Sequence, residues 1–222
     1  MKRKIFIAAI LVTIAIFSLA SASSSIAASR DDDELHRMGI FISNFTEQGL
    51  YTFDLEEDGD DSILHLGNPD NAGDLIRFGI AHNIINNPKS TLKKCRRRKC
   101  EYGPNIMAAD DVLRPIRKYF AIDDIEHQSI LGYAPEAYFD GDNYHFDAKS
   151  WGEDKIYYAD VQEVRRNKRV ITMEGELYNL KKKSERPAYF TATARPYKWG
   201  SKNTWSILSL RVEWKDDGRG AE

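Results

Sequence analysis

The chain has 222 residues, of which 42% are hydrophobic and 11% aromatic, and its formal charge at neutral pH is −2. This apolar content is typical of a globular protein with one sizeable core, and the length favours a single domain. Proteins that bind nucleic acid carry an excess of positive charge over much of their surface. The slight acidic excess therefore argues against nucleic acid as a partner.

The N-terminus has the layout of a secretory signal. A basic start precedes an apolar run over residues 5–19, and the small residues Ala20-Ser21-Ala22 follow it. The run is shorter than the roughly 20 apolar residues that a membrane span needs. We therefore predict a signal peptide over residues 1–22, no stable membrane span after cleavage, and an exported, periplasmic or secreted protein. An uncleaved N-terminal anchor is the alternative, because a few more apolar residues follow at 26–28.

Three segments show the three- and four-residue spacing of apolar residues that predicts amphipathic helices. They are ELHRMGIFISNF (residues 34–45), NPDNAGDLIRFGIAHNIINN (68–87) and ADDVLRPIRKYF (109–120). In the third segment, an N-terminal cap at Asp111 would place Pro115 near the first turn, where its missing N–H costs little. Residues 23–32, which precede the first helix, are expected to be flexible.

The stretch TLKKCRRRKCEY, residues 91–102, contains the two cysteines of the chain, Cys95 and Cys100. In an exported protein an oxidising compartment favours joining them as a structural disulfide. A zinc site would need two further ligands, and no histidine pair at the required spacing follows. A redox centre normally has two residues between its cysteines, whereas this pair has four.

From residue 133 onward the apolar period changes to two, which predicts strands between turns. In PEAYFDGDNYHFDA the residues Asp140 to Asn143 supply a hairpin turn. The predicted fold is α+β: about three N-terminal helices followed by a curved antiparallel sheet of five or six strands. It forms a single domain over residues 33–215, with a frayed tail at 216–222.

A resemblance is carried by two segments, GIFISNF (residues 39–45) and LIRFGIAHNIINN (75–87), and by the late run of predicted strands. In these features the chain resembles a group of exported bacterial proteins of uncharacterised function. The order of helices before a curved sheet is also similar to the cystatin-like, NTF2-like roll. Rolls of this type include enzymes, ligand-binding pockets and protein-binding modules, so the resemblance implies a fold and no site residue.

The sequence contains none of the common catalytic or phosphate-binding motifs, and we expect no cofactor and no metal. His82 lies on the second predicted helix, and Asp74 precedes it by two turns. The two could form an acid–base pair in a cavity between helix and sheet. The interpretation that we favour is a hydrogen-bonded structural histidine. Because the sequence also lacks a catalytic motif, we expect the protein not to be an enzyme.

Two surfaces are candidates for binding. The first is a basic array that a disulfide would hold in place, because clustered arginines present forked donors to phosphate or carboxylate. Its residues are Lys94, Arg96, Arg97, Arg98 and Lys99. The second is the aromatic-rich C-terminal part, from which we expect Trp199, in the turn-like KWGSKN, to be exposed.

We therefore predict an exported, non-enzymatic binding or interaction protein, of an inhibitor or immunity type. It would act through the basic array or the mouth of the sheet. Its partner would be an acidic protein or an anionic component of the cell envelope, and the sequence carries no indication of oligomeric state. The alternative is a small periplasmic enzyme or small-ligand binder that uses a cavity near His82.

Overall fold

The computed structural model describes residues 32–55, 63–96, 100, 102–132, 134–152 and 155–215. The predicted signal peptide, the flexible segment up to residue 31 and the tail at 216–222 lie outside these residues. Within them the chain forms four helices and ten strands. The helices are residues 32–46, α2 (Ala72–Asn86), α3 (Pro88–Thr91) and α4 (Ala109–Phe120), with short 3-10 turns η1 (Pro69–Asn71) and η2 (Ala148–Ser150).

The larger sheet has six strands in the order β2-β1-β10-β9-β8-β7. Its main part is an antiparallel meander of long strands: β7 (Tyr157–Asn167), β8 (Val170–Asn179), β9 (Ala188–Trp199) and β10 (Lys202–Trp214). The short strands β1 (Phe53–Asp54) and β2 (Leu64–His65) extend it beside β10. Register shifts interrupt β7 and β10, and such bulges bend and twist a sheet.

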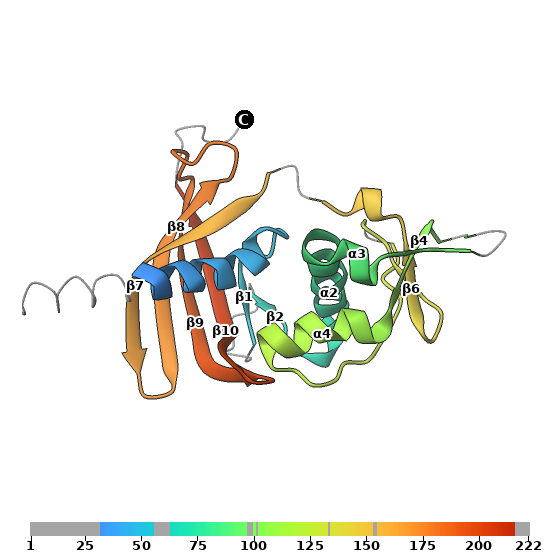
Figure 1. The fold of residues 1–222 in the computed structure, drawn as a ribbon, viewed down its shortest axis with the longest axis horizontal. Coiled ribbons are helices and arrows are strands. Elements are labelled where there is room, and N and C mark those ends of the chain that lie inside the picture. The colour runs from blue at the N-terminus through green and yellow to red at the C-terminus, as the bar shows by residue number, and fades with distance from the viewer. Residues whose placement is uncertain are drawn as a thin grey trace, which may run out of the picture.

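The helix at residues 32–46 crosses the larger sheet and packs against the free edge of β7 (Figure 1). Ser43 Oγ accepts a hydrogen bond from the backbone N–H of Ala159 at 3.0 Å, and Thr46 Oγ1 donates to the carbonyl of Tyr157 at 2.8 Å. Gly39 permits the close approach, because a Cβ there would lie 2.7 Å from the carbonyl oxygen of Ala159. The helix thus supplies partners to an edge strand that would otherwise have unpaired groups.

The smaller sheet has four antiparallel strands in the order β3-β4-β6-β5 and lies at the other end of the molecule (Figure 1). Its strands are β3 (Lys93–Lys94), β4 (Asn105–Ala108), β5 (Tyr138–Phe139) and β6 (Asn143–Phe146). The β5–β6 pair confirms the predicted hairpin, with Asp140 N–H donating to the Asn143 carbonyl at 3.0 Å. Helices α2 and α4 lie between the two sheets.

The aromatic ring of Phe45 is the centre of the core. Phe45 is fully buried, and its ring centroid lies 5.5 to 5.8 Å from five other rings that come from the first helix, β1, α2 and α4. These rings belong to Phe41, Phe53, Phe78, Tyr119 and Phe120. Aromatic contacts of this kind add to the burial of apolar area, so this cluster ties the helices to the larger sheet.

Helices α2 and α4 pack closely because Gly79 has no side chain. A Cβ at Gly79 would lie 2.4 Å from the carbonyl oxygen of Val112. The predicted cap at Asp111 is wrong, since α4 begins at Ala109 and Pro115 therefore lies inside the helix. Proline removes the hydrogen bond to the carbonyl four residues earlier, that of Asp111. The side chain of Asn83 on α2 donates to this carbonyl at 2.8 Å and so replaces the missing bond.

The α+β class is confirmed, and the three predicted helices occur at residues 32–46, 72–86 and 109–120. The predicted order, in which all helices precede the strands, differs from the structure. Strands β1 to β4 lie between the helices, and the strands divide into two sheets instead of one. Three of these four strands have only two residues, which is too short to show an alternating pattern in the sequence.

Candidate functional site

Cys95 and Cys100 form a disulfide with an S–S distance of 1.99 Å, as the sequence predicted. The bridge follows β3, where the backbone N–H of Cys95 donates to the Pro104 carbonyl at 2.9 Å. Of the basic array, Lys94 and Arg96 are exposed. Arg97, Arg98 and Lys99 lie outside the described residues.

The structure does not bring His82 and Asp74 together. They are eight residues apart on α2, which at a rise of about 1.5 Å per residue separates their backbones by about 12 Å along the axis. His82 is only 5% exposed, and its ring packs against those of Phe78 and Tyr119 at centroid distances of 5.8 and 5.0 Å. Asp74 is partly buried and lines a separate cavity.

Trp199 is half-buried at the end of β9, where it pairs with Lys202 across the hairpin. The hairpin turn contains Gly200 in the left-handed region, with φ of 59°. Trp199 is therefore less exposed than the sequence suggested, and it does not line the cavity beside α2.

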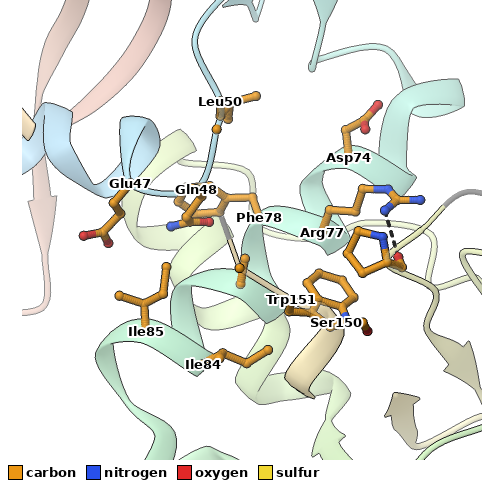
Figure 2. Close-up of a pocket in the computed structure, with 14 residues that line it drawn as sticks. Glu47, Gln48, Leu50, Asp74, Arg77, Phe78, Ile84, Ile85, Ser150 and Trp151 are labelled. Atoms are coloured by element: carbon orange, nitrogen blue, oxygen red, sulfur yellow. Dashed lines mark hydrogen bonds between the residues drawn. The ribbon is translucent and has the colours of Figure 1, made fainter. Parts of the chain in front are cut away.

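A cavity of about 280 Å³ lies between the end of the first helix, α2 and the segment that follows η2. Its volume is just below the ~300–1,000 Å³ that is usual for ligand pockets. Figure 2 shows Glu47 and Gln48 on one side of the cavity and Arg77 and Trp151 on the other. The apolar part of the lining consists of Leu50, Phe78, Ala81, Ile84, Ile85, Pro135 and the Trp151 ring.

Two carboxyl groups in the lining are poorly solvated. Glu47 is 5% exposed, and burial raises the pKa of its carboxyl, while a hydrogen bond from Asn86 Nδ2 to Oε1 at 2.7 Å opposes the rise. Burial also raises the pKa of Asp74, and the positive charge of Arg77 opposes it. Each side chain thus has less water around it than an ordinary surface carboxylate, and the ionised form of each gains from any further hydrogen-bond donor.

Arg77 holds one wall of the cavity in place. Its Nη1 donates to the backbone carbonyl of Pro135 at 2.8 Å, a contact between α2 and the loop before β5 (Figure 2). Since the guanidinium is delocalised and planar, such a bond also fixes the direction of the side chain.

Two buried polar atoms in the cavity wall have no hydrogen-bond partner among the described residues: Gln48 Oε1 and Trp151 Nε1. The orientation of Gln48 is set by its other amide atom, because Nε2 donates to the Asn44 carbonyl at 2.5 Å. Buried polar atoms nearly always have partners, and an unpaired one costs about 1–3 kcal/mol. An unpaired acceptor and an unpaired donor in the wall of one cavity make this cavity the candidate binding site.

A partly buried polar cluster adjoins the cavity wall at Glu47. Asn86, which binds Glu47, also contacts His82 Nδ1 at 3.3 Å. Tyr119 OH donates to Asn44 Oδ1 at 2.9 Å and accepts from Lys118 Nζ at 2.8 Å. Burial, with the nearby charge of Lys118, lowers the pKa of His82 to about 4, so its imidazole is neutral at pH 7.

The sequence did not predict the roles of Glu47, Gln48 and Trp151, because these residues belong to no motif and Trp151 is far in the chain from the other two. The only signal was weak: Glu47 and Gln48 directly follow the first apolar stripe, where polar residues are also expected of an ordinary helix end. Among the described residues, no group of three or more metal-ligating side chains lies close enough to hold an ion.

No protein-family model, curated protein or solved structure matches this chain. In the part of the chain that the structure describes, no helix is both long and apolar enough to cross a bilayer.

Proposed function

We propose that the protein is an exported, non-catalytic binding protein whose cavity between the first helix, α2 and η2 holds a small molecule. The observation that carries the proposal is the pair of buried, unpartnered atoms in the cavity wall, Gln48 Oε1 and Trp151 Nε1. A mostly apolar cavity with a few polar groups is the usual form of a small-molecule site. The small volume suits a ligand with few atoms.

Binding is favoured over catalysis because the lining lacks an activated nucleophile. Among the described lining residues Ser150 alone has a hydroxyl, and its Oγ donates to the Asp147 carbonyl at 2.7 Å, not to a base. His82, a buried histidine on α2, does not line the cavity. Nucleophilic catalysis needs a nucleophile and a base within hydrogen-bond reach of each other.

The test is a fragment screen on the mature chain, residues 23–222, by ligand-observed NMR. We expect fragments that bind the native protein and lose binding in Trp151→Phe, which removes the indole N–H and keeps an aromatic ring. The matched control is Trp214→Phe, because Trp214 is 48% exposed and lies outside the cavity lining. If no fragment binds, or if Trp151→Phe binds the same fragments equally well, this function is rejected.

A second candidate function uses the basic array as a binding surface for an acidic protein or an anionic envelope component, in the manner of an inhibitor or immunity protein. It is supported by the disulfide at the end of the β3–β4 hairpin and by the exposed side chains of Lys94 and Arg96. Replacing Arg96, Arg97 and Arg98 by serine should weaken binding to anionic lipid vesicles.

The control for this second function is a variant with serine in place of the exposed lysines 181–183 between β8 and β9, which removes the same charge elsewhere. Equal loss in both variants would mean that net charge, and not the array, determines binding.

We further propose export to the periplasm or the medium and an NTF2-like roll. The signal-like N-terminus and the disulfide support export. A helix that crosses a bent antiparallel meander supports the roll. Intact-mass measurement of the protein from the culture fraction tests export, since cleavage after Ala22 gives a chain that begins at Ser23.

A further inference from the structure

The charge of the cavity favours a cationic ligand over an anionic one. Three of the described lining residues are charged, namely Glu47, Asp74 and Arg77, so the formal charge of the wall is −1. The single cation, Arg77, already donates to the Pro135 carbonyl. An anion would be placed beside two carboxylates in a poorly solvated site, which is unfavourable.

The hydrogen-bonding groups of the wall lead to the same conclusion. Asn86 donates to Oε1 of Glu47, which leaves Oε2 of the same carboxylate as an acceptor for a ligand. Gln48 Oε1 is a second open acceptor. Glu47 and Gln48 are adjacent in the chain and lie on the same side of the cavity (Figure 2). An ammonium group carries three donors and no acceptor, and therefore matches a wall with more open acceptors than donors.

The remaining lining specifies the rest of the ligand. Phe78 and Trp151 offer aromatic rings, which attract cations and also pack against apolar groups. Trp151 Nε1 is an unpaired donor on a side chain that is only 8% exposed, so the ligand also needs one acceptor such as a hydroxyl or carbonyl oxygen.

We infer that the cavity binds a small organic cation: an amine with an apolar body and one oxygen acceptor, whose ammonium group lies at Glu47 and Gln48. The inference rests on the proposed function of the cavity. It specifies the charge class of the ligand and the side of the cavity at which the charged group binds.

The experiment compares three probes with the same 4-hydroxyphenyl skeleton, whose phenol oxygen can accept a hydrogen bond from Trp151 Nε1: the amine tyramine, the alcohol tyrosol and the acid 4-hydroxyphenylacetate. Each is titrated calorimetrically into the mature chain, residues 23–222, at pH 7. We expect the amine to bind at least tenfold more tightly than the alcohol, and 4-hydroxyphenylacetate not to bind. Glu47→Gln keeps the acceptor for Asn86 and removes the charge, so it should reduce the ratio of amine to alcohol affinity at least fivefold while alcohol binding is unchanged.

The matched control is Glu213→Gln, an exposed carboxylate on β10 outside the cavity, which should keep the full preference for the amine. Circular dichroism and thermal unfolding of each variant establish that it is folded before its affinities are compared. A preference that falls equally in both variants would place the selectivity in the overall charge of the protein and overturn the site.

The outcomes separate this inference from the proposed function. Equal binding of amine and alcohol, or tighter binding of 4-hydroxyphenylacetate, overturns the cationic class and leaves the cavity as a binding site. The cationic class is also overturned, and the cavity remains a binding site, if none of the probes binds while neutral or acidic fragments from the screen do. If neither the probes nor any fragment binds, the proposed function itself is rejected, and the inference with it.

Discussion

The burial of His82 should make the stability of the protein fall on mild acidification. The pKa of its imidazole drops from 6.5 to about 4 in the folded chain, first because burial disfavours the charged form and second because Lys118 is nearby. The unfolded chain therefore binds a proton more tightly than the folded chain. The contribution of His82 to stability is fully present above pH 6.5 and is lost as the pH falls from 6.5 towards 4.

The size of the effect follows from the two pKa values. At about 1.4 kcal/mol per pKa unit, the full loss is about 3 kcal/mol, and about 2 kcal/mol of it is already lost by pH 5. His82 is 5% exposed, so screening by solvent does not reduce this figure substantially. Such a loss is a large part of the 5–15 kcal/mol that is typical of a folded domain.

The assay is urea unfolding at pH 7, 6 and 5, followed by tryptophan fluorescence, for the native chain and for His82→Gln. The variant lacks the titrating group, so the difference in unfolding free energy between the two proteins should shift by about 2 kcal/mol from pH 7 to pH 5. Other groups titrate in both proteins and cancel in this difference. His36→Gln, which removes an exposed histidine, is the control for the loss of a histidine side chain as such. A difference that stays constant with pH would refute the reasoning.

Three further predictions concern stability. Gly79→Ala should cost at least about 2 kcal/mol in thermal unfolding, because its Cβ would lie 2.4 Å from a carbonyl oxygen of α4. Gly73→Ala on the same helix should be neutral or stabilising, because the nearest atom to its Cβ would be Gln128 Nε2, at an ordinary contact distance of 4.0 Å. If the two variants are equally stable, the close helix contact is wrong. Replacing Cys95 and Cys100 by serine should cost about 2 kcal/mol in urea unfolding, the loop-closure entropy of so short a ring, and no change would mean that the bridge does not restrict the unfolded chain to this extent. Glu47→Gln should keep or slightly raise the free energy of unfolding at pH 7, because burial raises the pKa of this carboxyl above its unfolded value of 4.5 and so penalises its ionised form. The native chain should gain on the variant as the pH falls towards 4.5, and a marked loss of stability at pH 7 would show that the charge of Glu47 is needed.

The three main helices were predictable because their signal is local. Each carries its apolar residues on one stripe, and α4 ends at the predicted residue 120, although it begins at Ala109, before the predicted cap at Asp111. The position of Pro115 was misjudged because the compensation is not local. Asn83, on another helix, supplies the hydrogen bond that the proline removes, so a mid-helix proline costs less here than the sequence suggests.

The cavity was not predictable for a related reason. Its open acceptor comes from Gln48 at the end of the first helix, and its open donor from Trp151, more than one hundred residues later in the chain. Each residue taken alone is unremarkable in the sequence. Only their burial without partners marks them, and burial is a property of the folded chain.

The sequence by itself determined the α+β class, the places of the main helices, the β5–β6 hairpin and the Cys95–Cys100 bridge. Each of these depends on residues that are close together in the chain. The tertiary structure decided the division of the strands into two sheets, the docking of the first helix on the edge of β7, and the cavity. These depend on contacts between distant segments, whose energies come from packing and from hydrogen-bond partners that no local pattern specifies.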